Sequence, residues 1–122
     1  MILADSSIWI DNLKKANADF IAKLQTGGIY MHPYVTAELA LGHLKNRTKI
    51  LRWYASLPHI SIASHAELLK TIESHGLYGR GVGFVDAHLL ASVLLTPGTL
   101  LWTRDKRLRA VAEESGIHVN LN

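Results

Sequence analysis

The feature that most constrains the fold is an alternation of short apolar runs with longer segments of helical periodicity. Five short runs are rich in apolar or β-branched residues, and we expect them to be strands: residues 2–4, 29–31, 59–63, 99–102 and 117–119. Strands that alternate with helices in this way form βαβ units around a parallel sheet. The sequence therefore predicts an α/β protein.

Capping residues mark where the intervening helices begin and end. Ser64 and Glu67 form a capping-box sequence ahead of an amphipathic run. Asn17 precedes a second helical pattern, and Pro33 suits the first turn of a third. The segment 84–95 is apolar nearly all round, which predicts a helix that is buried on most sides.

The composition excludes several classes of protein. The chain has no cysteine, which rules out a disulfide scaffold, a thiol nucleophile and a thiolate zinc site. Its seven histidines show no pair at zinc-ligand spacing. No apolar run reaches about 18 residues, and the start lacks the pattern of a signal peptide, so we expect a cytoplasmic protein without a membrane segment. A length of 122 residues with 48% hydrophobic content predicts a single domain over residues 1–122.

Two aspartates lie just after predicted strands. Asp5 directly follows the strand at 2–4, and Asp105 closely follows the strand at 99–102. In an open parallel sheet, ligands bind beyond the carboxyl ends of the strands. Each aspartate also stands where a strand gives way to a helix, so each fits the N-cap of a helix at least as well when taken singly.

Two further acids complete a possible cluster. Glu38 lies about one helical turn past the second predicted strand, and Asp86 lies in the first turn of the predicted buried helix. A carboxylate among apolar neighbours is costly to bury without a partner. Either Arg80 or a metal ion shared with the other carboxylates would supply that partner for Asp86. Four carboxylates from distant parts of the chain can thus converge.

Four segments of the chain resemble the PIN domains of VapC-type toxins, in the right order and at the usual spacing. They are ILADSSIWIDNL, VTAELALG, GRGVGFVDAHLLAS and LLWTRDKRLRAVA, and the similarity runs from residue 2 to about residue 119. The resemblance implies a three-layer α/β/α sandwich with a central, mainly parallel five-stranded sheet. It also implies that Asp5, Glu38, Asp86 and Asp105 are catalytic metal-site acids, with Thr103 and Ser7 as polar helpers.

The resemblance further implies a metal-dependent endoribonuclease, the toxin of a type II toxin–antitoxin module that hydrolyses structured cellular RNA such as tRNA or rRNA. A homodimer and a small VapB-like antitoxin that covers the site are implied as well. The chemistry agrees, because Mg²⁺ and Mn²⁺ prefer oxygen ligands and activate water at neutral pH. We expect Asp5 and Asp86 to bind the principal ion, Asp105 to be a further ligand, and Glu38 to orient a water or bind a second ion.

The basic residues suit a polyanionic partner. If the four acids face a metal, the other six of the 10 acids oppose 13 Lys and Arg, a balance of +7 for the remaining surface. The cations nearest the acids in sequence are predicted to contact RNA phosphates, with solvated surface charge as the alternative for each. They are Arg80, Arg104, Lys106 and Arg107.

Three other functions remain open at this stage. A PIN nuclease of RNA maturation would use the same acids. A phosphoryl-transfer domain of the receiver or haloacid-dehalogenase kind also places an aspartate after its first strand, although the dehalogenase type expects a second aspartate where this chain has Ser7. A binding module whose aspartates merely cap helices would leave Asp86 unexplained.

Overall fold

A parallel sheet of three short strands lies at the centre of the protein. The computed structural model describes residues 1–121, and its strands are β1 (Ile2–Ala4), β2 (Ile29–Tyr30) and β3 (Leu100–Trp102). The order is β2-β1-β3, with Ile2 opposite both Ile29 and Leu100. All three residues of β1 are buried. The predicted α/β class and parallel sheet are confirmed.

The prediction of five strands is wrong, because residues 1–121 contain three. The segments 59–63 and 117–119 reach the sheet, but each forms a single parallel bridge, Met31 with His59 and Leu101 with His118. Pairing at the first bridge stops because the chain after Met31 turns into a helix that starts at Pro33. Two hydrogen bonds to Leu101, at 2.7 and 2.9 Å, flank the second bridge. Both segments therefore extend the sheet by one residue pair instead of a strand.

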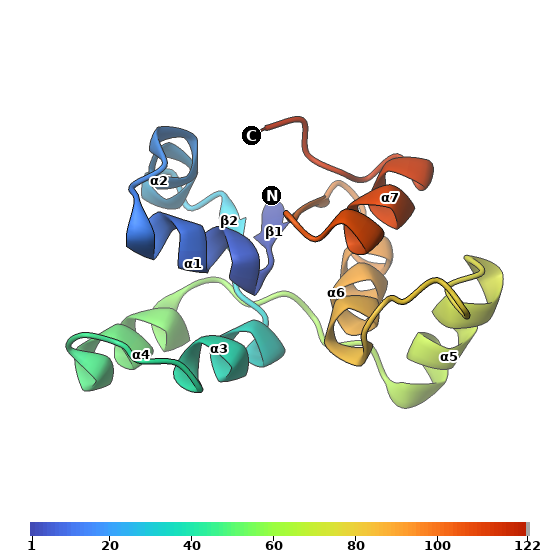
Figure 1. Ribbon diagram of the computed structural model, residues 1–122, viewed down its shortest axis with the longest axis horizontal. Helices are drawn as coiled ribbons and strands as arrows, with labels where there is room; N and C mark the ends of the chain where they lie inside the picture. Colours follow the sequence, from blue (N-terminus) through green and yellow to red (C-terminus); the bar gives the residue numbers. More distant parts are fainter. Residues whose placement is uncertain (122) are drawn as a thin grey trace.

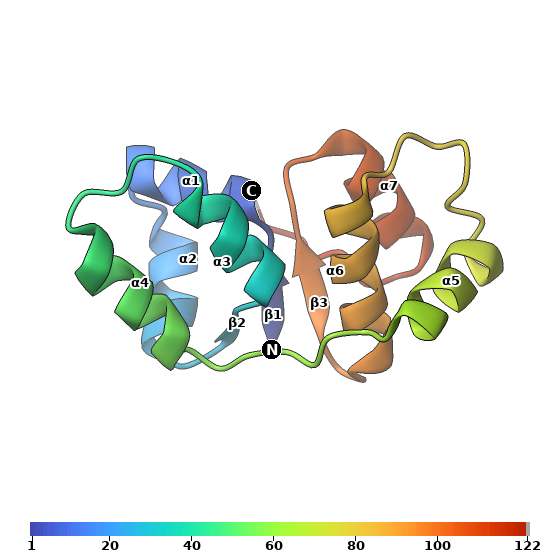
Figure 2. The same cartoon turned by 90° about the horizontal axis from the view of Figure 1, so that it is seen from below.

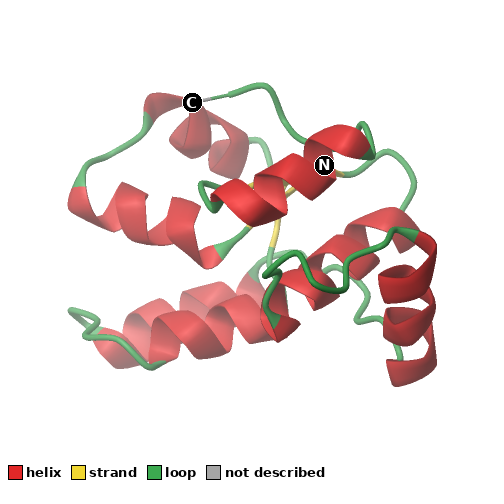
Figure 3. Ribbon diagram, turned by 45° about the vertical axis from the view of Figure 1, so that its right-hand side comes forward, coloured by secondary structure: helices red, strands yellow, loops and turns green. Residues whose placement is uncertain are grey.

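Seven helices within the described residues surround these strands. They are α1 (Ser6–Lys14), α2 (Ala18–Gln25), α3 (Pro33–Ala40), α4 (Arg47–Ser56), α5 (His65–Ser74), α6 (Phe84–Leu95) and α7 (Lys106–Glu114). Figure 1 and Figure 2 show α1 to α4 on one side of the strands and α5 to α7 on the other. Helices make up most of the regular structure, as the colouring of Figure 3 shows. None of the helices in residues 1–121 has the length and apolar character needed to cross a membrane.

The starts of α2, α3 and α5 follow the residues that predicted them. Ser64 accepts a hydrogen bond from the backbone of Glu67 at 3.1 Å, and the Glu67 side chain accepts from the backbone of Ser64 at 2.8 Å, which completes the capping box. Asn17 accepts from the backbone N–H of Phe20 at 3.0 Å. Pro33 opens α3, as expected. The central part of α6 is buried, and this helix carries Asp86 in its first turn.

Candidate functional site

Asp5 lies at the carboxyl end of the central strand, where its backbone and side chain are both held. Its backbone N–H donates to the carbonyl of Trp102 at the end of β3, at 3.0 Å. Its Oδ1 caps α1 by accepting from the Ser7 N–H at 2.9 Å, and also accepts from the Ser7 hydroxyl. Its Oδ2 accepts from the hydroxyl of Thr103. Asp5 is 4% exposed, so these bonds fix a buried carboxylate at the edge of the sheet.

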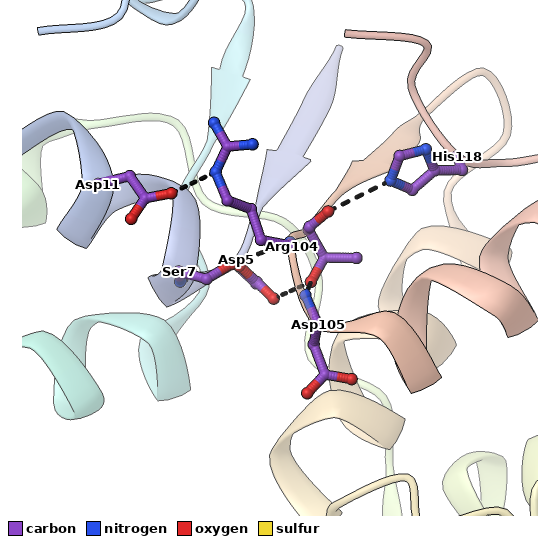
Figure 4. A network of polar contacts seen from close by, with 7 residues as sticks. Asp5, Ser7, Asp11, Arg104, Asp105 and His118 are labelled. Atoms are coloured by element: carbon purple, nitrogen blue, oxygen red, sulfur yellow. Dashed lines mark hydrogen bonds and ion pairs between the residues drawn. The ribbon is translucent and has the colours of Figure 1, made fainter. Parts of the chain in front are cut away.

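Asp105 lies at the corresponding position after β3. Its Oδ1 caps α7 by accepting from the N–H groups of Arg107 and Leu108, at 3.0 and 2.9 Å. Its own N–H donates to the Thr103 hydroxyl oxygen at 3.0 Å. Thr103 therefore bonds to both aspartates, and Figure 4 shows Asp5 and Asp105 within this network of polar contacts.

The capping bonds leave one oxygen of each aspartate open. A carboxylate oxygen accepts about two hydrogen bonds. Oδ1 of Asp5 and Oδ1 of Asp105 each accept two, whereas Oδ2 of Asp5 accepts one. Oδ2 of Asp105 accepts none from residues 1–121. Capping a helix and binding a cation are therefore compatible roles for both residues, since they use different oxygens.

Glu38 and Asp86 reach this edge from helices on opposite sides of the sheet. Glu38 on α3 accepts a hydrogen bond from the Ser6 hydroxyl at 3.3 Å, which ties it to the first turn of α1 beside Asp5. Burial is the largest of the effects that together raise the pKa of Asp86 to about 6, and the negative charges of Asp5, Asp105 and Glu38 follow in that order. The structure thus brings the other three predicted acids within electrostatic range of Asp86.

Burial also raises the pKa of Asp5. The hydrogen bonds from Ser7 and Thr103 act in the opposite direction, because they stabilise the charged carboxylate. At Asp86, by contrast, the charges of neighbouring carboxylates add to the effect of burial, so ionised acids repel one another at this site. A bound cation would remove this repulsion.

The donors fit a hard divalent cation in their chemistry. All four predicted ligands are carboxylates, the ligand type that Mg²⁺ and Mn²⁺ prefer. As the side chains stand, however, no three acidic, histidine or cysteine residues in the described part of the chain are close enough to hold one ion together. If these acids hold one ion together, the side chains of the more exposed ones, Glu38 and Asp105, would have to rotate toward it.

Arg80 is not the partner of Asp86. Its two terminal nitrogens donate to the carboxylate of Glu114 on α7, at 2.6 and 2.8 Å. This pair raises the pKa of Arg80 and lowers that of Glu114, mainly through the hydrogen bonds between the two side chains. Arg80 is therefore excluded as the charge partner of Asp86, because its guanidinium group is paired with Glu114.

The other predicted RNA-contacting residues lie at the start of α7. Arg104 forms an ion pair with Asp11 on α1 through its Nε. The Arg107 side chain passes over Gly81, where an added Cβ would lie 2.9 Å from its Nη1. Lys106 is exposed in the first turn of α7. Of these three cations, Arg104 therefore lies against α1 and Arg107 against the loop at Gly81.

The sequence did not indicate two polar contacts of the site. The bond from Ser6 to Glu38 spans 32 positions, and the ion pair of Asp11 with Arg104 joins α1 to the segment after β3. Ser6 could have been suspected from its place beside Asp5 in the first helical turn. Asp11 carries no local signal, because its partner is distant in sequence.

Comparisons with known proteins agree with this geometry. The sequence profile of the PIN domain matches residues 2–114. Ribonuclease VapC32 of Mycobacterium tuberculosis (strain CDC 1551 / Oshkosh) is 45% identical over 117 residues, which cover 96% of this chain and 94% of that protein. Ribonuclease VapC32 of Mycobacterium tuberculosis (strain ATCC 25618 / H37Rv) is similar to the same extent. The chain therefore belongs to the PIN domain family, as the four resembling segments predicted, and it is of the VapC type.

Proposed function

We propose that this chain is an endoribonuclease that uses Mg²⁺, with Mn²⁺ as a substitute, to hydrolyse phosphodiester bonds in structured cellular RNA such as tRNA or rRNA. The observation that carries this proposal is the environment of Asp86. Its half-buried carboxylate faces the charges of three other acids. No basic side chain among residues 1–121 forms an ion pair with it. An unpaired carboxylate cluster of this kind favours a divalent cation.

Each acid has a proposed role. Asp5 and Asp86 hold the principal ion, Asp105 is a further ligand, and Glu38 orients the attacking water or binds a second ion. A bound divalent ion supplies a more acidic water and neutralises charge on the phosphoryl oxygens. Thr103 and Ser7 keep the Asp5 carboxylate in one orientation through their hydroxyl groups. Oδ2 of both strand-end aspartates remains available for the ion.

The biological role that we propose is that of the toxin in a type II toxin–antitoxin module. The relatives that cover nearly the whole chain bear the name Ribonuclease VapC32. A small VapB-like antitoxin would bind the toxin and block the site, the toxin would act as a homodimer, and the cellular RNA substrate would place its action in the cytoplasm. Family membership favours a nuclease over the phosphoryl-transfer alternatives.

Sequencing of RNA 5′ ends after brief induced expression tests activity and substrate together. Wild type and a surface control, Asp19→Asn, should arrest growth and create new ends at a few positions in tRNA or rRNA. Asp5→Asn should create none. New ends only at normal processing sites, without growth arrest, would identify a nuclease of RNA maturation instead. Folded wild type that creates no new ends would overturn the proposal.

A further inference from the structure

We propose that a pocket beside the acidic site binds a phosphate group of the RNA backbone next to the phosphate that is cleaved. This inference rests on the proposed ribonuclease function and adds a substrate-binding subsite to it. The pocket has a volume of about 360 Å³ and lies where α1 ends and α2 begins. It is lined by Asp11, Lys14, Lys15, Ala16, Asn17 and Arg104. We call it the α1–α2 pocket.

The α1–α2 pocket is physically joined to the acidic site through Arg104. The backbone N–H of Arg104 donates to the hydroxyl oxygen of Ser7 at 3.1 Å, and that hydroxyl donates to Asp5. Figure 4 shows the side chains of Arg104 and Asp105 extending in opposite directions from adjacent positions. In our proposal, one strand of RNA places a phosphate against the acids and a neighbouring phosphate against Arg104.

The ion pair with Asp11 leaves the phosphate-binding part of Arg104 open. Asp11 contacts Nε of the guanidinium group, and the two terminal nitrogens make no hydrogen bond within residues 1–121. In Figure 4 these nitrogens extend away from Asp11. A planar guanidinium group binds phosphate oxygens through two parallel N–H donors. Asp11 is therefore a positioning residue, which holds Arg104 while its terminal donors remain available.

The charge of the pocket favours an anion. Among residues 1–121, three cations line it, Lys14, Lys15 and Arg104, together with one carboxylate, that of Asp11. The C-terminal end of α1 contributes partial negative charge to the pocket. The N-terminal end of α2 contributes partial positive charge, which offsets it. By contrast, Arg80 is neutralised by Glu114. The α1–α2 pocket thus offers uncompensated positive charge close to the acidic site.

A charge-matched pair of double variants tests the role of the lysines. Lys14→Gln/Lys15→Gln removes two charges from the pocket, and Lys23→Gln/Lys70→Gln removes two charges from α2 and α5. Binding of fluorescein-labelled RNA is measured by anisotropy in EDTA over a range of salt concentrations. The pocket variant should lose about tenfold in affinity, and its salt slope should fall by roughly 0.7 to 0.9 per lost contact, as for backbone phosphates. Equal losses in the two double variants would overturn the subsite.

Single variants of Asp11 test the positioning role. Asp11→Ala and Asp19→Ala both raise the net charge by one, so non-specific attraction of RNA rises equally. If Asp11 holds Arg104 in place, Asp11→Ala should bind RNA several-fold more weakly than Asp19→Ala. Asp11→Asn should recover part of the loss, because an amide oxygen at the same position can accept a hydrogen bond from Nε. Tighter binding by Asp11→Ala would show that Asp11 competes with phosphate, which would overturn the positioning role.

Cleavage assays separate this proposal from the ribonuclease proposal. With Mg²⁺, Lys14→Gln/Lys15→Gln should raise KM about tenfold and leave kcat within about twofold, because the pocket binds substrate away from the reacting phosphate. If wild type cleaves RNA and the pocket variant behaves like its control, the subsite is wrong and the nuclease stands. If RNA binding depends on the pocket but wild type does not cleave, the nuclease is wrong and the pocket stands.

Discussion

Thr103 donates its side-chain hydrogen bond to Asp5, a residue 98 positions earlier in the chain. The same hydroxyl accepts from the backbone N–H of Asp105 at 3.0 Å. Thr103 is 1% exposed, so water does not compete for these bonds. One buried hydroxyl group therefore sets the relative positions of the two strand-end aspartates, and the geometry of the acidic site depends on it.

Replacing Thr103 with valine should damage both stability and activity. The substitution keeps the shape of the side chain but leaves Oδ2 of Asp5 and the N–H of Asp105 without their partner. Leaving buried polar groups unsatisfied costs about 1–3 kcal/mol. We expect a lower free energy of unfolding and at least a tenfold loss of kcat/KM. Thr103→Ser keeps the hydroxyl and should retain most activity; equal activity of the valine and serine variants would show that the hydroxyl has no positioning role.

Asp86→Asn should stabilise the metal-free protein and remove its response to metal. At pH 7.5 in EDTA, the ionised Asp86 is repelled by Asp5, Asp105 and Glu38, and the asparagine variant lacks this repulsion. Its Tm should therefore exceed that of wild type. Mn²⁺ at a hundredfold excess over Kd should stabilise wild type by about 2.7 kcal/mol, and most of this gain should be lost in the variant.

The control for these thermal melts is Asp19→Asn, on the exposed surface of α2. It should melt close to wild type in EDTA and keep the full response to Mn²⁺. If wild type shows no shift with Mn²⁺ and Asp86→Asn is simply less stable, Asp86 has a structural role and does not bind metal.

His32 should make the fold sensitive to acid. Burial lowers its pKa to about 4, and the neighbouring His88 and His59 contribute in the same direction. The folded pKa is thus below the unfolded value of about 6.5, so only the unfolded state takes up a proton between these pH values. Stability is complete above about pH 6.5 and falls as the pH drops toward 4. The slope from this one proton is up to about 1.4 kcal/mol per pH unit.

Urea unfolding of His32→Asn between pH 4 and 7 measures this contribution. Nδ1 of His32 caps α3 by accepting from the Tyr34 N–H at 3.0 Å, and asparagine is a good N-cap that does not titrate. The variant should lose less stability on acidification than wild type. His75→Asn, at an exposed position after α5, serves as the control and should follow wild type. Parallel curves for wild type and His32→Asn would refute the role of His32.

Local sequence patterns were sufficient for the fold class and for the starts of α2, α3 and α5. The capping box at Ser64 is set by residues three apart, so the sequence contains the whole interaction. The strand predicted at residues 59–63 failed for a non-local reason. Its pairing depends on how far its neighbour stays extended, and that neighbour enters α3 at Pro33. The residue pattern of a segment does not predict how long the neighbouring strand is.

For the acidic site too, the sequence predicted what depends on local position and not what depends on tertiary packing. The positions of Asp5 and Asp105 after strands predicted their convergence, and both also proved to be helix caps. The sequence alone could not show that each cap uses Oδ1 and leaves Oδ2 open. Arg80 lies six positions from Asp86 in sequence but pairs with Glu114 on α7, because the tertiary packing sets its partner.

The proposal that Asp5 and its neighbours cleave RNA through a bound metal ion is best tested with purified protein. Total RNA is incubated with wild type, Asp5→Asn or Asp19→Asn, in Mg²⁺ or in EDTA, and cleavage rates are measured from the appearance of new ends. Wild type and Asp19→Asn should cleave in Mg²⁺ and stop in EDTA, and Asp5→Asn should be slower by orders of magnitude, since it lacks a metal ligand. Full cleavage in EDTA, or full activity of Asp5→Asn, would show that the acidic site does not act through a bound metal ion.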